Sequence, residues 1–386
     1  MDKHRCKCFS TPHRCASLFL NRSRRVVVFV VPPCRCAVVS SCFRGAKPCE
    51  PDKLMRTKRF VRAPPCLRAS VLDLLRDLLA GLDHRPPLIA LALCALIGCA
   101  ARTLPGVTEP AAAQLFAGAR TDVARFGADS NEGRFEVLTT LLTERRLAFE
   151  VEPFTITPRK GETRTEGRNV IVTLAGDEPE LVVGAHYDAV RLRDGRFSKG
   201  AVDNAASVVV LVRIAEALSR SRPDRRIRIV FFDMEELGLL GSAQYIQEHP
   251  DRKPLAMVNL DVNAFGDTLI YGPRTQTNAG VVRSMQQACG DVSRACVEFP
   301  RMPPSDDISF QKAGIPVVSI ATVPQVQAHQ LWLVMNGGAE SGLPKGFAPR
   351  VLRTIHTEED TASLVDPDAM ARVYRAVLNL IARLDR

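Results

Sequence analysis

The chain has 386 residues, of which 46% are hydrophobic and 24% charged, so it can bury a sizeable core in one large domain or two ordinary ones. Its formal charge of +10 would suggest a nucleic-acid or acidic-lipid partner. However, residues 1–98 carry 18 Lys+Arg and 6 Asp+Glu, a net charge of +12, and the remainder has a net charge of −2. We therefore expect no nucleic-acid partner for the folded body.

The first 70 residues are rich in Arg, Cys, Pro and Val and show neither helical nor strand periodicity. Their cysteines do not recur as CxxC pairs and their histidines fit no zinc-finger spacing, which argues against a zinc module. We expect residues 1–70 to be a disordered leader or a mis-assigned one. In the second case, translation would start at Met55 or Val71.

An apolar run of about twelve residues follows within residues 86–102, PPLIALALCALIGCAAR. Its length suits the hydrophobic region of a signal peptide and is too short for an ordinary membrane span. The run ends in Leu96-Ile97-Gly98-Cys99, which resembles the lipobox of bacterial lipoprotein signals. We therefore predict a signal peptide with a lipobox over residues 71–99, and lipid attachment at Cys99. The alternative is an uncleaved N-terminal anchor.

Either alternative exports the body of the protein, residues 100–386, to the periplasm or the cell surface. The membrane is then contacted only through the N-terminal lipid or anchor. The body would face an oxidising space, where disulfides persist. Its two cysteines, Cys289 and Cys296, are expected either to form a local disulfide between a helix end and the next strand or to remain as two buried thiols.

Helical and strand patterns alternate along the body. The expected helices are 108–128, 131–147, 203–219, 239–248, 281–288, 308–313 and 366–384, and the expected strands are 150–157, 169–174, 181–186, 226–232, 255–260, 268–271, 295–299 and 317–320. This alternation predicts an α/β fold, a three-layer sandwich whose mostly parallel sheet is covered by helices on both faces. Residues 323–354 form a long connection without clear periodicity, which is typical of functional or mobile loops.

Three carboxylates cluster in the stretch IVFFDMEELGLLGS, where a buried strand ends. They are Asp233, Glu235 and Glu236, and no basic residue stands beside them in the sequence. Adjacent carboxylates repel one another, and a metal ion is the first candidate to offset that repulsion. The alternative is a solvated acidic loop. The position favours the metal, because open α/β sheets bind ligands at the carboxyl ends of their strands.

Other potential ligands follow strands or open helices in the same way. His186 and Asp188 come after LVVGA, Asp203 opens a helix, and Asp261 follows MVNL, whereas His356 lies in TIHTEED. Imidazole and carboxylate are ordinary zinc ligands. The HxD spacing lets a carboxylate accept the second ring N–H of the histidine, which is the orientation that metal-binding histidines need.

Six segments together resemble a known family. They are GAHYD, GAVDNAAS, FFDMEELGLLGS, VNLDV, SDDISFQKAGIPVVSI and IHTEEDTASL. Their order resembles that of the motifs in zinc-dependent exopeptidases of the bacterial leucine-aminopeptidase type, a superfamily that includes glutaminyl cyclases and glutamate-carboxypeptidase-like proteins. The resemblance covers residues 169–384. One departure is Val202, because the family usually has Asp before the bridging Asp.

The resemblance implies two Zn²⁺ ions and a role for each residue of the cluster. Asp203 would bridge the ions, His186 and Asp261 would complete one site, Glu236 and His356 the other, Asp188 would orient His186, and Glu235 would be the general base. Asp360 is expected either to support His356 or to be an ordinary carboxylate at a helix start.

The implied function is that of a dizinc metallo-aminopeptidase. It would hydrolyse N-terminal residues from peptides with a free N-terminus, through a metal-bridging water activated by Glu235. One alternative is a single-zinc enzyme similar to glutaminyl cyclase. A second alternative is a non-catalytic binding module on the same fold, although such relatives typically lose ligands and this chain keeps all five.

Overall fold

The computed structural model describes residues 26–31, 35–40, 106–157, 164–293 and 295–385. The chain divides into two units, Met1–Leu93 and Cys94–Arg386, and each is described by itself. The predicted signal segment 71–99, with its lipobox and Cys99, lies outside the described residues. None of the helices in the described ranges combines the length and the apolar character needed to cross a bilayer.

Within the first unit the structure describes one antiparallel pair of strands, β1 (Val26–Val31) and β2 (Arg35–Ser40). We expected no regular element in this stretch. The runs VVVFVV and RCAVVS are rich in β-branched residues, which favour strands even where polar and apolar residues do not alternate. The remainder of the predicted leader lies outside the described residues.

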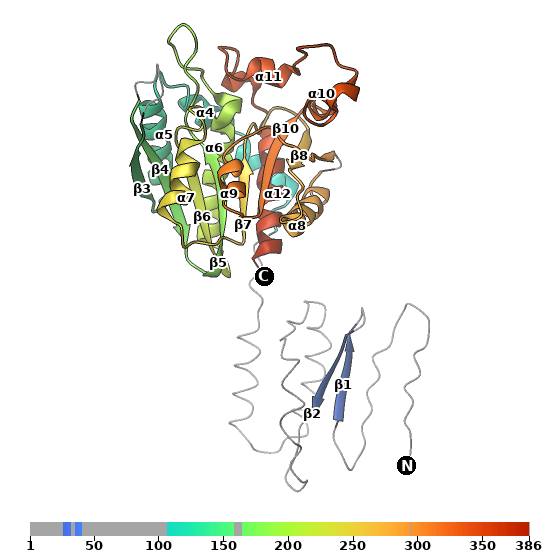
Figure 1. Cartoon of the computed structure of the whole chain (residues 1–386). Helices are drawn as coiled ribbons and strands as arrows, with labels where there is room; N and C mark the ends of the chain where they lie inside the picture. The colour runs from blue at the N-terminus through green and yellow to red at the C-terminus, as the bar shows by residue number, and fades with distance from the viewer. Residues whose placement is uncertain (1–25, 32–34, 41–105, 158–163, 294, 386) are drawn as a thin grey trace. The chain divides into compact units, whose positions relative to one another are not determined.

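The second unit is built on an eight-stranded sheet (Figure 1). In spatial order the strands are β3 (Glu150–Thr155), β4 (Glu166–Leu174), β6 (Arg225–Phe232), β5 (Asp177–His186), β7 (Ala256–Leu260), β10 (Val317–Val323), β8 (Thr268–Gly272) and β9 (Cys296–Glu298). Four of the seven neighbouring pairs are parallel, including the central run β6–β5–β7–β10. The predicted mostly parallel sheet is confirmed.

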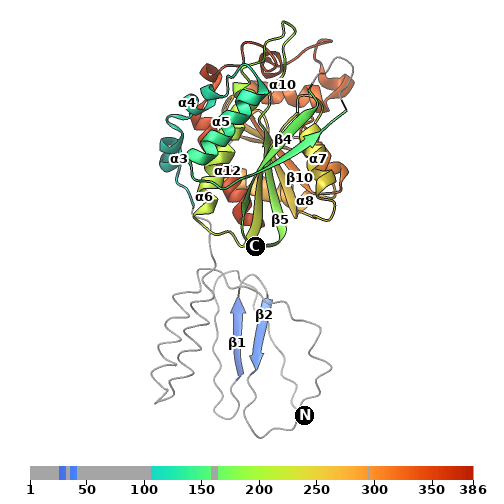
Figure 2. The ribbon, with the colours of Figure 1, turned by 90° about the vertical axis from the view of Figure 1, so that its left-hand side faces the viewer.

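Helices cover both faces of this sheet. One face packs against α3 (Glu109–Phe116), α4 (Ala119–Arg125), α5 (Asn131–Glu144), α6 (Ala206–Ser219), α8 (Ala279–Gly290) and α12 (Pro367–Leu384), and the other against α7 (Leu240–Glu248) and α9 (Asp307–Lys312). Figure 2 shows α5, α6 and α12 on one side of the sheet and α7 on the other. The predicted three-layer sandwich is therefore confirmed.

The central strands are apolar on both sides because both sides are buried. Along β5, Val182 packs into the core under α7 and α9, while Val183 packs into the core under α6 and α12. All residues of β7 and β10 are buried. Continuous apolar strands of this kind are typical of sheets covered on both faces.

Further element predictions differ from the structure. The helix expected over 203–219 begins only at Ala206, because the backbone is not helical at Asp203 and Asn204. The single helix expected over 108–128 is divided into α3 and α4 at Ala117 and Gly118, because glycine is a poor helix former. The connection 323–354 contains α10 (Gln325–Asn336), the short turn η4 (Gly338–Ser341) and α11 (Arg350–Thr354). Apolar residues lie on several sides of α10, so its sequence carries no clear helical period. Figure 1 shows α10 and α11 beyond one end of the sheet.

A disulfide joins Cys289 to Cys296. It links the last turn of α8 to the first residue of the edge strand β9, seven positions further along the chain. This decides between the two alternatives that the sequence left open for these cysteines. The bond fixes the outer edge of the sheet to the helix that packs against it.

Candidate metal centre

The candidate metal ligands converge where the central parallel strands end. His186 is the last residue of β5, Glu235 and Glu236 follow β6, and Asp261 follows β7. Because β6, β5 and β7 are parallel neighbours, their carboxyl ends meet at one edge of the sheet. In open α/β folds this edge is where ligands bind.

Asp203 lies between the two histidines. It belongs to the irregular turn η3 (Ala201–Ala205), whose backbone is not helical at Asp203 and leads directly into α6. Its Oδ1 is 3.1 Å from His186 Nε2, and its Oδ2 is 3.1 Å from His356 Nε2. The two oxygens of one carboxylate therefore face two different imidazoles, which is the arrangement expected of a bridging ligand.

Two groups of ligand atoms surround this carboxylate. In the first, His186, Glu235 and Asp261 bring atoms within 4.8 Å of one another, and Asp261 Oδ1 is 3.6 Å from His186 Nε2. In the second, Asp203, Glu236 and His356 do the same, with Glu236 Oε2 at 3.1 Å from His356 Nε2. The two groups together contain all five predicted ligands, and the first group also contains Glu235.

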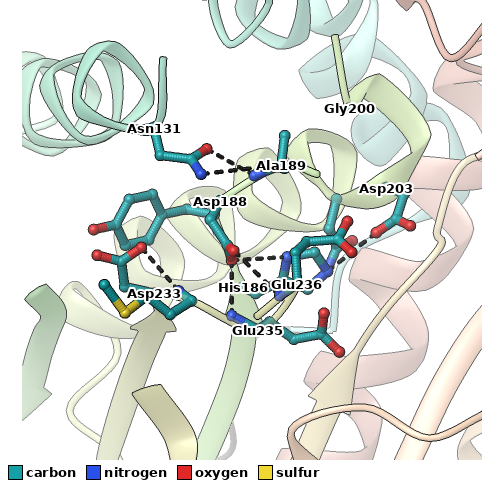
Figure 3. Close-up of polar contacts among 12 residues, drawn as sticks. Asn131, His186, Asp188, Ala189, Gly200, Asp203, Asp233, Glu235 and Glu236 are labelled. Atoms are coloured by element: carbon teal, nitrogen blue, oxygen red, sulfur yellow. Dashed lines mark hydrogen bonds and ion pairs between the residues drawn. The ribbon is translucent and has the colours of Figure 1, made fainter. Parts of the chain in front are cut away.

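Asp188 supports three members of the cluster at once (Figure 3). Its Oδ1 lies 3.4 Å from His186 Nδ1, on the side of the ring opposite the ligand atom. The same carboxylate accepts hydrogen bonds from the backbone N–H groups of Glu235, at 3.1 Å, and Glu236, at 3.2 Å. The expected contact with His186 is present, and the contacts with the two glutamates were not foreseen.

The charges of the centre call for a cation. Burial, followed by the repulsion of nearby carboxylates, raises the pKa of Glu236 to about 7 and the pKa of Glu235 well above its ordinary range. Within the described residues, Glu236 Oε1 and Asp261 Oδ1 are buried without a hydrogen-bond partner. Buried polar atoms are nearly always satisfied. Free carboxylate oxygens beside two imidazoles fit the ligand chemistry of zinc.

The pKa of His356 also reflects the nearby carboxylates. Hydrogen bonds to Asp203 and Glu236 raise the pKa of His356 to about 11. Burial tends to raise the pKa of Asp203, but its hydrogen bonds with His186 and His356 outweigh burial and lower it. Protons on the imidazoles thus balance the carboxylates here, in positions that a divalent cation would take over.

Asp360 makes different contacts from those expected. Its Oδ1 accepts from the Val202 N–H at 2.7 Å and its Oδ2 from the Asp203 N–H at 3.0 Å. It therefore holds the backbone of Asp203, whereas we expected a contact with His356 or an ordinary helix start. The sequence carries no signal for this contact, because the two segments are more than 150 residues apart.

Asp233 stabilises the fold through buried hydrogen bonds. It is fully buried, accepts from Arg164 Nη2 at 2.6 Å and from the Arg168 N–H at 2.9 Å, and bonds the Met234 N–H. The sequence showed no basic residue near this carboxylate, because its partner comes from the segment before β4. Of the three acidic residues after β6, two thus lie in the candidate metal centre and one stabilises the fold.

A cavity of about 260 Å³ opens beside the cluster. Asp203, Glu235, Asp261 and His356 are among the residues that line it. The remaining wall is largely apolar and includes Ile270, Met302, Leu331, Val351 and Ile355. Leu331 and Val351 come from α10 and α11, so the long connection contributes directly to this cavity.

Two curated relatives match about a third of the chain. The chain is 32% identical over 146 residues to aminopeptidase YwaD of Bacillus subtilis, a match that covers 36% of this chain and 31% of the relative. It is 30% identical over 141 residues to a vacuolar membrane protease of Saccharomyces cerevisiae, covering 35% of this chain and 14% of that protein. The matches span only about a third or less of these relatives.

Solved structures share the fold. A Zn-dependent exopeptidase from Parabacteroides distasonis superposes with a TM-score of 0.55 at 19% identity, covering 72% of this chain and 99% of the other. A glutaminyl cyclase from Fimbriiglobus ruber gives a TM-score of 0.55 at 17% identity, covering 72% of this chain and 96% of the other. At these identities the likeness shows the zinc-exopeptidase fold alone.

The model of Peptidase family M28 matches residues 169–381. This segment is more than half of the 386-residue chain and contains every predicted ligand, from His186 to His356. The curated relatives and the shared fold agree with this match. The chain therefore belongs to peptidase family M28.

Proposed function

We propose that this protein is a dizinc aminopeptidase that removes N-terminal residues from peptides. The observation that carries the proposal is the position of Asp203, whose two oxygens face His186 and His356 at 3.1 Å each. A carboxylate placed in this way is suited to hold two ions at once. Membership of family M28 supports a zinc peptidase, and the two ligand groups support two ions.

The ligands would divide between the ions along the lines of the two groups, with Glu235 left free and Asp203 shared. His186 and Asp261 would hold one ion, Glu236 and His356 the other, and Asp203 both. A bound pair of zinc ions supplies Lewis-acid polarisation of the scissile carbonyl and lowers the pKa of a water molecule. Asp188 keeps the His186 ring and the backbone of both glutamates in place.

Glu235 is placed to move the proton. Its carboxylate lies beside the ligand atoms of His186 and Asp261 and lines the cavity that would hold the substrate. A carboxylate in this position takes a proton from the attacking water and delivers it to the leaving amine.

The cavity favours an apolar side chain on the substrate. Ile270, Met302, Leu331 and Val351 surround the space next to the acidic cluster. The substrate that fits is a peptide whose first residue is apolar.

A glutaminyl cyclase remains the second candidate, because the Fimbriiglobus ruber cyclase and the Parabacteroides distasonis exopeptidase superpose equally well. Such an enzyme would need one zinc ion. The presence of two ligand groups, with Asp203 facing a histidine of each, favours the dizinc aminopeptidase.

We also propose that the protein is exported and anchored through lipid at Cys99. The Leu96–Cys99 segment supports this, and the Cys289–Cys296 disulfide is of a kind found in oxidising compartments. Mass spectrometry of the N-terminal peptide from a native membrane fraction should show a lipidated Cys99. A mature N-terminus upstream of Cys99, without lipid, would contradict the proposal.

Substrate preference tests the proposed function. We expect Leu-p-nitroanilide to be hydrolysed with a kcat/KM about 10- to 100-fold above that of the Gly substrate, because burying a Leu side chain contributes about 1.5–3 kcal/mol. N-acetyl-Leu-p-nitroanilide should not be hydrolysed. Cleavage of the acetylated substrate at a similar rate would contradict the requirement for a free N-terminus, and cyclisation of N-terminal Gln alone would favour the second candidate.

The role of Glu235 can be tested with Glu235→Gln. The amide keeps the shape but cannot take a proton, so kcat should fall about 10²- to 10⁴-fold while bound zinc is retained. The matched control is Glu248→Gln on α7, whose side chain is exposed and bonds only Gln244 among the described residues. Unchanged turnover in Glu235→Gln would remove Glu235 from the mechanism.

A further inference from the structure

Arg134 is a charged residue buried beside the metal centre. It lies on α5 and is 0% exposed. Its guanidinium donates four hydrogen bonds to backbone carbonyls: Nε to Tyr187 at 2.5 Å, Nη1 to Phe126 at 2.8 Å and to Lys199 at 2.9 Å, and Nη2 to Gly200 at 3.2 Å. One side chain thus joins three separate segments of backbone.

Two of these segments carry residues of the proposed centre. Tyr187 lies between His186 and Asp188, and Gly200 immediately precedes the turn η3 that holds Asp203. One helical turn before Arg134, Asn131 exchanges two hydrogen bonds with the backbone of Ala189, at 3.1 and 2.8 Å (Figure 3). The same face of α5 therefore forms hydrogen bonds with the backbone on both sides of Asp188.

The acceptors of Arg134 are unusual for a buried cation. Among the residues that the structure describes, it forms no ion pair, and its hydrogen bonds go to carbonyls. Burial lowers its pKa to about 10, against the opposing effect of Asp188, Asp360, Asp203 and Glu236, so it stays charged at neutral pH. Burying a charge has an effective penalty of several kcal/mol, which argues for a specific use of this group.

The backbone at Gly200 is shaped for this contact. Its φ is +51°, and a Cβ atom there would lie 2.7 Å from the Asp203 carbonyl oxygen and 3.1 Å from Arg134 Nη1. A side chain at this position would push the guanidinium and the Asp203 turn apart. The close approach of Arg134 to this turn therefore depends on glycine.

We propose that Arg134 is a positioning residue of the metal centre, which clamps the His186–Asp188 segment to the turn that presents Asp203. It lies outside residues 169–381, so the match to family M28 does not include it. The proposal rests on the proposed function, because it concerns the ligands of that centre. Arg134 touches neither substrate nor metal and acts through the backbone of the ligands.

The sign of the effect on zinc affinity separates this role from simple electrostatics. A cation near two zinc ions repels them, so its removal would tighten zinc binding if charge alone mattered. A clamp predicts the opposite, because loss of the hydrogen bonds releases His186 and Asp203 from their bridging geometry. Residues that orient metal ligands typically contribute about 10- to 100-fold to metal affinity.

The experiment compares zinc dissociation constants, measured by competition with a chromogenic chelator, in wild type, Arg134→Met and Arg134→Lys. We expect Arg134→Met to bind zinc about 10- to 100-fold more weakly. Lysine keeps the charge but cannot bridge both segments with one ammonium, so Arg134→Lys should resemble Arg134→Met. Equal or tighter zinc binding in Arg134→Met, or full recovery in Arg134→Lys, would overturn the proposal.

The control is Arg228→Met, which removes another buried arginine, one that pairs with Glu180 at 2.8 Å in the amino-terminal half of β6. It should lower the thermal midpoint of unfolding without changing the zinc dissociation constant.

If the Arg134 variants do not fold, Asn131→Ala removes the hydrogen bonds to Ala189 alone and should still weaken zinc binding. An unchanged constant there would overturn the clamp. Wild-type protein that binds no zinc would instead overturn the proposed function itself.

Discussion

The mutual repulsion of buried carboxylates at one edge of the sheet is the constraint on which the rest of this structure depends. Glu235, Glu236 and Asp261 approach one another because the strands β6, β5 and β7 are parallel and adjacent, and the turn η3 adds Asp203 to them. Burial makes their charges more costly, as the raised pKa values of the two glutamates show. Two imidazoles offset part of this cost, and the ligand set as a whole fits divalent zinc.

Such a cluster needs rigid surroundings, and hydrogen bonds to backbone groups supply much of that rigidity. Asp188 accepts from the amides of both glutamates, and Asp360 accepts from the amides of Val202 and Asp203. Arg134 reverses the pattern by donating to the carbonyls around the same segments. The backbone around the ligands is thus held by two acceptor side chains, Asp188 and Asp360, and one donor side chain, Arg134. Each comes from a different part of the chain.

The sequence predicted the parts of the centre that follow local rules. The strands could be recognised from continuous apolar runs, and the positions of His186, Glu236 and Asp261 follow from the rule that functional residues lie at strand ends. The Arg164–Asp233 pair, the bonds of Asp360 and the reach of Arg134 could not be predicted, because each joins segments that only the folded sheet brings together. The helix α10 was missed because its apolar residues lie on several sides: Leu331 is buried and lines the cavity, whereas Val326 and Val334 are exposed.

The central claim is that Asp203 bridges two zinc ions. The most direct measurement is the number of zinc ions bound to each folded chain, determined by native mass spectrometry on wild type and on His356→Ala. The account predicts two ions in wild type and one in His356→Ala, because His356 belongs to only one of the two ligand groups. One ion in wild type, retained in His356→Ala, would contradict the account and favour a single-zinc enzyme.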